Sequence, residues 1–330
     1  MDLSTLLQEG VSLVVVIVGV PAVLAAYIIG GEYLVRLLPD RFRGGLRPWL
    51  WVGPALFFVT AFLVLPALGT LLQSFENDNG DWVGLRNYVN QLGDFSGGAW
   101  IAIRNNVYWL VLYTLVSLFF GLLLAVIFDR VPYENVVKSL IFMPMAISSV
   151  ALAVIWKFMY SYQPPGAPQT GTLNAIVVNV FHGLPQTWIT DPRFNNFALV
   201  AAATWGITGF AMVILSAALK GIPGELLEAA RVDGAGEITI FRRVILPLMM
   251  PTVVVVGTTL VIFALKAFDV VYVMTAGNYK TDVLANRMYK LLYQSYNLGG
   301  ASSVAMVLLI AVVPVLIFNL RQFRAVEARR

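Results

Sequence analysis

The side chains that carry out most covalent chemistry are scarce in this sequence. Its 330 residues include no cysteine and one histidine, His182. The first count excludes disulfides, thiolate metal sites and cysteine nucleophiles, and the second disfavours a Ser-His-Asp triad and a histidine-based metal site. No G-x-x-x-x-G-K-[ST] run occurs, since Gly277-Asn278-Tyr279-Lys280-Thr281 has the wrong spacing. We expect a chain that is not an enzyme and that binds no metal or cofactor of its own.

Charged and polar side chains gather instead in one segment, residues 228–247, EAARVDGAGEITIFRRVILP, set between two long apolar runs. Pro223 suits the first turn of a preceding helix, and acids at Glu225 and Glu228 are favoured near the positive end of that helix. Gly234 allows the chain to turn, and a second short helix then leads into the next apolar run. The pattern predicts a helix-turn-helix elbow, although amphipathicity alone would favour a plain interfacial linker.

The elements on either side of this elbow are apolar enough to cross a membrane. Hydrophobic residues make up 59% of the chain and charged residues 12%, whereas soluble chains have about 25% charged residues. We therefore expect an all-α polytopic membrane protein with about seven transmembrane helices. The predicted spans are roughly 11–30, 49–72, 107–128, 139–160, 198–219, 248–268 and 303–320.

The first span could also be read as a signal peptide. Residues 1–10 hold no Lys or Arg, whereas the start of a signal peptide is basic, so we expect a retained helix. Pro144 and four other prolines inside the spans would kink or break their helices.

Lys and Arg are distributed unevenly between the two sides of the predicted bundle. If the elbow is cytoplasmic, the inner segments hold 14 basic residues and the outer segments hold 6. The positive-inside rule then places the N-terminus outside and the C-terminus in the cytoplasm. The inner anchors are the Arg36/Arg41/Arg43/Arg47 cluster and the 321–330 tail.

The elbow resembles the EAA signature of ABC-importer permeases, E-A-A-x3-G-x9-I-x-L-P, with Val244 in place of the usual Ile. In that family the loop forms a coupling helix that docks into a cytoplasmic ATPase. The resemblance implies that Glu228 accepts from a basic group of the ATPase and that the two alanines keep the docking face small. It also implies that Gly234 lets the backbone turn where a side chain would clash. The implied coupling residues are Glu228, Ala229, Ala230, Asp233, Gly234, Leu246 and Pro247.

Other stretches are similar to binding-protein-dependent sugar permeases of the maltose and alpha-glucoside type. These are SLIFMPM at 139–145, Thr204-Trp205, LKGIP at 219–223 and FDVVYVMTAG at 268–277. The family core has six spans, so the resemblance assigns residues 49–330 to the ABC importer permease domain. Residues 1–48 would add an N-terminal helix and a basic cytoplasmic loop.

A substrate path would need aromatic faces and neutral hydrogen-bonding groups, because these recognise sugars. The family places its site on spans equivalent to 139–160, 198–219 and 248–268, and hydroxyls in such helices also commonly bond back to the backbone. The path candidates are Thr204, Trp205, Thr208, Phe210, Thr258, Thr259 and Phe263.

The resemblance implies a permease subunit of an ATP-driven importer for a sugar or oligosaccharide, in a bacterial or archaeal cell membrane. Its partners would be a second homologous permease, two ATPase subunits that bind ATP and Mg, and an extracytoplasmic solute-binding protein. One alternative is the same importer type for glycerol phosphate, an amino acid or a polyamine. A secondary carrier, or a channel, would need neither the elbow nor an ATPase. An intramembrane enzyme would need clustered His, Asp or Glu in the spans.

Overall fold

The structure, a computed structural model, describes residues 15–129 and 131–327. Within these ranges it is helical and has no strand, apart from an isolated bridge between Glu76 and Trp82. The all-α prediction is confirmed. The elements are η1 (Val15–Gly19), α2 (Val20–Leu37), α3 (Asp40–Val59), η2 (Thr60–Val64), α4 (Leu65–Gln73), α5 (Arg86–Leu92), α6 (Gly98–Tyr108), η3 (Trp109–Tyr113), α7 (Thr114–Ile127), α8 (Glu134–Phe142), η4 (Met143–Ala146), α9 (Ser149–Met159), α10 (Thr172–Asn179), α11 (Asn195–Lys220), α12 (Gly224–Val232), α13 (Glu237–Ile240), η5 (Phe241–Ile245), α14 (Leu246–Leu265), α15 (Asp269–Thr275), α16 (Leu284–Tyr293) and α17 (Leu298–Glu327).

The chain divides into two compact units, Met1–Thr70 and Leu71–Arg330. The division predicted after residue 48 is of another kind, because it separates an added N-terminal helix from the permease domain. It stays a prediction. Arg130, Arg329, Arg330 and the segment 1–14, on which part of the orientation argument depends, lie outside the described residues.

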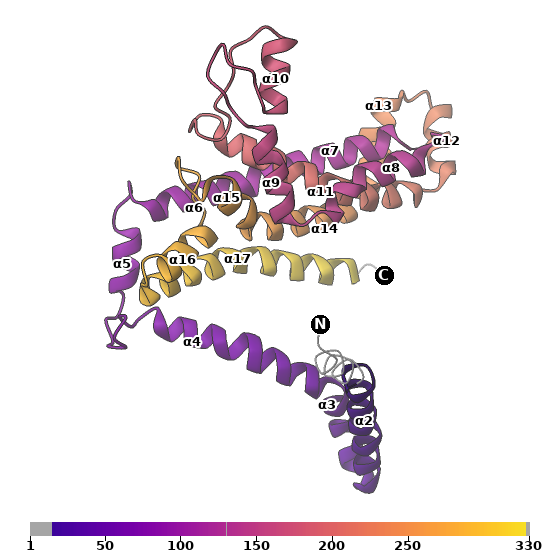
Figure 1. Ribbon diagram of the computed structural model, residues 1–330. Coiled ribbons are helices and arrows are strands. Elements are labelled where there is room, and N and C mark those ends of the chain that lie inside the picture. Colours follow the sequence, from indigo (N-terminus) through magenta and orange to yellow (C-terminus); the bar gives the residue numbers. More distant parts are fainter. Residues whose placement is uncertain (1–14, 130, 328–330) are drawn as a thin grey trace, which may run out of the picture. The chain divides into compact units, whose positions relative to one another are not determined.

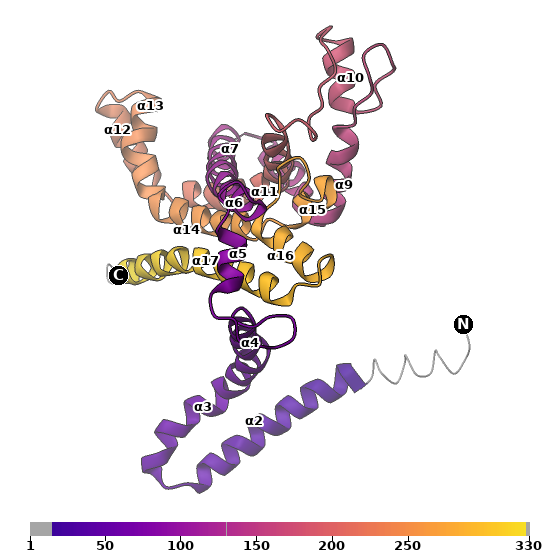
Figure 2. The ribbon, with the colours of Figure 1, turned by 90° about the vertical axis from the view of Figure 1, so that its left-hand side faces the viewer.

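The first unit contains a hairpin of α2 and α3 (Figure 2). The two helices are separated only by Leu38 and Pro39. The predicted basic loop 31–48 therefore consists of the end of α2, this two-residue turn and the start of α3. Glu32 ties the helices together by an ion pair to Arg47 of α3, and it also pairs with Arg36 of its own helix at 3.4 Å. The Arg residues expected to anchor the inner side therefore lie around this turn, and two of them share one carboxylate.

The second unit is built around α11, which packs against α7, α8 and α14 (Figure 1). Small residues allow the close approach of α11 to α7, because a Cβ added at Gly121 would lie 2.6 Å from the Cβ of Ala211. Such contacts drive helix association where lipid supplies no hydrophobic difference. Leu199, Met212 and Leu215 of α11 are fully buried, so this helix forms the centre of the apolar core.

Five helices of the described residues are long and apolar enough to cross a membrane, and a bent pair raises the number to six. The five run over Ile17–Leu37, Asp40–Gln73, Gly98–Ile127, Asn195–Lys220 and Glu237–Leu265. They overlap five of the predicted spans; the last four begin earlier than predicted, and the first runs on to Leu37. The last predicted span lies in α17, whose apolar part, Leu298–Pro314, is shorter than the rest. The number seven stays a prediction.

The predicted span 139–160 is not one straight helix. The helices Glu134–Ala146 and Ser149–Met159 are bent by 100° with respect to each other. Pro144 ends α8 because proline lacks the N–H that would continue the ladder and its ring clashes with the preceding turn. Ser148 starts the next helix, its Oγ accepting from the Ala151 N–H at 3.2 Å. The break therefore has a cap on one side and a proline on the other.

Candidate functional site

The elbow predicted from the sequence is present as α12 and α13, at the point where α11 ends and α14 begins (Figure 1). The α12 helix ends in a Schellman motif, in which the Ala235 N–H bonds to the Ala230 carbonyl and the Gly234 N–H to the Arg231 carbonyl, both at 3.0 Å. Gly234 has φ +81°. An L side chain is strained in this left-handed conformation, so the motif favours glycine here.

The expected reason for Gly234 was partly wrong. A Cβ at this position would meet nothing within 4 Å, so no neighbouring side chain requires the glycine. Gly236 has an ordinary φ of −72° and precedes α13 as its cap. The chain therefore uses the conformational freedom of glycine at Gly234 but not at Gly236. Neither position needs glycine to avoid a steric clash.

The second half of the elbow continues without interruption into the next span, since one helix runs over Glu237–Leu265. Arg231 of α12 bonds to Glu237 of α13 at 2.9 Å and closes the elbow. Leu246 and Pro247 follow the π-helical turn η5 inside this helix and begin α14. A displacement of the elbow is therefore passed directly to α14.

The elbow presents an open surface with apolar and acidic side chains. Glu228, Ala229 and Asp233 are exposed, and Val232 and Ile238 are 88% and 75% exposed. Leu227 and Ile240, by contrast, are buried. Exposed apolar side chains of this size, beside carboxylates, are typical of a surface that another protein covers.

A cavity of about 420 Å³ lies beside the middle of α11 and the end of α14 that is remote from the elbow. Its walls come from η3, η4, α9, α11 and the end of α14 with the following turn. The lining residues are Trp109, Tyr113, Pro144, Met145, Ile147, Ser149, Leu152, Ala203, Gly206, Ile207, Phe263, Lys266, Ala267, Phe268, Asp269 and Val270. The cavity size suits a small ligand.

Of the seven path candidates, Phe263 lines this cavity. The hydroxyls of Thr208, Thr258 and Thr259 donate to carbonyls four residues earlier, at 2.7, 2.7 and 3.1 Å. These three side chains are satisfied by their own helices.

The remaining three candidates contact other side chains of the protein. Thr204 accepts from Ser117 of α7 at 3.5 Å. Trp205 meets the ring of Trp156 edge-on at 5.8 Å, and Phe210 packs against the apolar core. The substrate-path role of all seven stays a prediction.

The sequence reasoning missed the aromatic wall of the cavity. Trp109 and Tyr113 lie in the π-helical turn η3, and both are buried. The indole N–H of Trp109 is buried without an acceptor among the described residues. A buried donor without a partner costs free energy, and a ligand hydroxyl in the cavity could satisfy it. The four-residue spacing of these aromatics is a signal in the sequence, but packing residues share it.

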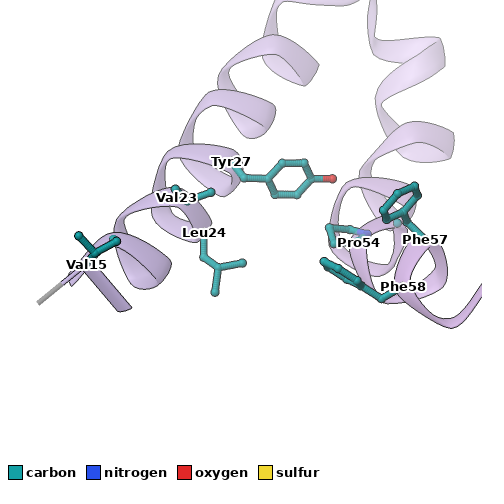
Figure 3. A pocket seen from close by; sticks show the side chains of 9 residues that line it. Val15, Val23, Leu24, Tyr27, Pro54, Phe57 and Phe58 are labelled. Carbon is teal, nitrogen blue, oxygen red and sulfur yellow. The ribbon is translucent and has the colours of Figure 1, made fainter. Parts of the chain in front are cut away.

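A larger hollow, of about 900 Å³, lies in the first unit between α2 and α3 (Figure 3). Apart from the Tyr27 hydroxyl, its lining side chains are apolar: Val15, Val23, Leu24, Pro54, Phe57 and Phe58. That hydroxyl already donates to the Leu50 carbonyl at 3.1 Å. A polar solute would find no free donor on these side chains, so this hollow is a poorer candidate site than the smaller cavity.

Comparisons with known proteins agree on one family. The model of the family described as "Binding-protein-dependent transport system inner membrane component" matches residues 117–328. The osmoprotective compounds uptake permease protein GgtC of Synechocystis sp. is 49% identical over 282 residues, covering 85% of this chain and 100% of the relative. The alpha-glucoside transport system permease protein AglF of Rhizobium meliloti is 46% identical over 283 residues, covering 85% and 83%.

A solved structure shares the fold. One chain of a bacterial ABC transporter involved in the import of the acidic polysaccharide alginate superposes with a TM-score of 0.72 and 24% identity. The superposition covers 86% of this chain and 99% of that chain.

Proposed function

Because the chain belongs to the family of binding-protein-dependent transport system inner membrane components, and so is a multi-pass permease subunit of an ABC importer, we propose that it imports a neutral sugar or glycoside by alternating access. It works with a second homologous permease, two cytoplasmic ATPase subunits and an extracytoplasmic solute-binding protein. The elbow faces the cytoplasm, the N-terminus lies outside and the C-terminus inside.

The observation that carries this proposal is the connection between the elbow and the cavity. The α11 helix contributes Ala203, Gly206 and Ile207 to the cavity and ends at Lys220, next to the elbow. The α14 helix leaves the elbow and contributes Phe263. Helices of 26 and 20 residues are about 40 and 30 Å long. One displacement at the elbow thus reaches two walls of the cavity.

The energy must enter through the elbow, because the sequence has no phosphate-binding loop. The ATPase subunits bind ATP and Mg, and their closure pushes the docked elbow. Glu228 and the small Ala229 form the docking face with the exposed Val232 and Ile238. Closure favours the outward-facing state, which accepts substrate, and hydrolysis resets it.

The substrate class follows from the wall of the cavity and from the relatives. Trp109, Tyr113 and Phe268 offer aromatic faces, and the Trp109 N–H offers a free donor. One relative of the chain is an alpha-glucoside permease and another transports osmoprotective compounds. A neutral glycoside fits both the cavity and the relatives, and other solutes are outcomes of the test below.

The test is a pull-down of the tagged chain from mild detergent, comparing wild type with Glu228→Lys. We expect an ATPase and a second permease to co-purify with wild type and to be lost or loosened in the variant. Asp191→Lys, an equal charge reversal in the loop before α11, is the matched control and should retain both partners. Uptake of radiolabelled sucrose, trehalose and maltose into proteoliposomes then tests the substrate class. A chain that purifies alone and transports without ATP would be a secondary carrier.

A further inference from the structure

A charged cluster joins the start of α8 to the end of α11. Glu134, the first residue of α8, accepts from Lys220, the last residue of α11, at 2.6 Å. Glu134 also pairs with Lys138, whose ammonium bonds to the hydroxyl of Ser216 on α11. The side chains of Glu134 and Lys138 are 12% and 14% exposed. Water screens the enclosed Glu134–Lys138 pair only weakly, whereas the Lys220 side chain is 52% exposed and its pair with Glu134 is screened more strongly.

The position of each charge strengthens the joint. Glu134 lies at the positive end of α8, and Lys220 lies at the negative end of α11. Each side chain is thus stabilised by its own helix dipole as well as by its partner. Because α12 follows after only three residues, Gly221, Ile222 and Pro223, the joint lies beside the elbow.

A second contact holds the other end of α8. Gly209 of α11 lies against the backbone of Ile141 and Phe142, so closely that a Cβ would stand 2.4 Å from the Ile141 oxygen. The α8 helix is therefore fixed to α11 near both of its ends. Beyond the second contact comes the 100° break at Ile147 and Ser148, where Pro144, Met145, Ile147 and Ser149 line the cavity.

We propose that Glu134 is a positioning residue that makes α8 move with the coupling elbow, so that ATP-driven motion appears as a change of angle at the break beside the cavity. This inference rests on the proposed function. Without Glu134, two lysines of like charge face each other across the α8–α11 contact, and α8 is no longer fixed next to the elbow. The ATPase still docks and hydrolyses ATP, but the part of the cavity wall at the break no longer moves with the elbow.

The absence of cysteine in the chain makes the motion measurable. Spin labels at Val136→Cys on α8 and Ile155→Cys on α9 occupy side chains that are 62% and 41% exposed and lie on either side of the break. The complete importer, with cysteine-free partner subunits, is compared in proteoliposomes without nucleotide and with ATP trapped by vanadate. We expect the label distance to change in wild type and to change much less in Glu134→Gln.

Transport gives the second readout. ATP hydrolysed per molecule of labelled sugar imported should rise at least about fivefold in Glu134→Gln, the lower end of typical coupling effects. Lys220→Glu should behave alike, whereas Lys220→Arg, which keeps the charge beside Glu134, should couple like wild type. Asp40→Asn, which removes an exposed pair with Arg43 in the first unit, is the matched control and should match wild type.

The outcomes distinguish a failure of this inference from a failure of the proposed function. An unchanged label distance in wild type, or an equal change and equal ATP cost in Glu134→Gln, overturns this inference alone. A loss of coupling in Lys220→Arg equal to that in Lys220→Glu also overturns it, because the charge of the pair then does not set the coupling. If no ATPase co-purifies at all, the proposed function fails first, at the pull-down.

Discussion

Gly209 of α11 lies so close to Phe142 of α8 that a Cβ on the glycine would stand 2.6 Å from the Phe142 Cα. The contact is backbone against backbone, so no side chain can rotate away to make room. Close approach of this kind is how helices associate tightly in lipid. It also fixes the proline-ended α8 against the most buried helix of the second unit.

We expect Gly209→Ala to destabilise the protein by about 1–3 kcal/mol, since overpacking forces backbone shifts. Thermal unfolding of the detergent-solubilised chain measures the effect. Gly257→Ala is the control, because its Cβ would meet only the Leu118 side chain, at an ordinary 3.9 Å. This control should match wild type or exceed it, since alanine favours helix. Equal unfolding temperatures for the two variants would refute the contact.

Gly234→Ala should disturb the elbow without unfolding the bundle. The left-handed conformation at φ +81° costs alanine about 1–2 kcal/mol, and the Schellman motif frays before the transmembrane helices do. We expect weaker co-purification of the ATPase with little change in the thermal midpoint. Gly224→Ala, in helical backbone with open space around it, is the control and should retain the ATPase.

Trp109→Phe should weaken substrate binding, because it keeps a ring in the cavity wall and removes the unpartnered N–H. A hydrogen bond of about 0.5–1.5 kcal/mol corresponds to a rise in KM of roughly two- to tenfold with kcat nearly unchanged. Uptake kinetics in proteoliposomes measure this. Trp156 also has a buried N–H without a partner but does not line the cavity, so Trp156→Phe should leave KM unchanged. A similar shift in both variants would mean that the N–H does not contact the substrate.

Asp282 should give the protein a distinctive pH dependence. It lies outside the candidate spans, between α15 and α16, and burial raises its pKa above the usual value although Asn286 and Lys290 oppose this. A carboxyl with a raised folded pKa contributes stability that is present below its unfolded pKa and is lost as pH rises through the folded one. The wild type should therefore lose part of its thermal midpoint as pH rises from about 4 to about 7, above the unfolded pKa, and Asp282→Asn should remove that loss.

Asp191 provides the opposite sign as a control for this measurement. The Arg193 side chain lowers the pKa of Asp191, so its stabilisation is lost as pH falls through the folded pKa. Asp191→Asn should remove a destabilisation that appears only toward acid pH. If Asp282→Asn instead removed a loss of stability on acidification, the ionised form of Asp282 would be the favoured one.

The sequence predicted the helices and the elbow because both are local properties. Apolar runs of about 20 residues indicate segments that cross a lipid bilayer. Five of the predicted runs are long apolar helices in the structure. The elbow followed from residues within one segment, where the Gly234 turn and the Leu246-Pro247 start are set by neighbours along the chain. The family resemblance, which rested on the same residues, is confirmed by the comparisons.

The tertiary structure alone decided which side chains meet. Hydropathy could not distinguish Phe263, which lines the cavity, from Phe210, which packs in the core, because the facing of a helix depends on its neighbours. The bend of 100° after Pro144 needed its cap at Ser148, and the pairing of Glu134 with Lys220 joins residues far apart in the sequence. Local pattern therefore determined what each segment is, and close packing of helices determined what each side chain touches.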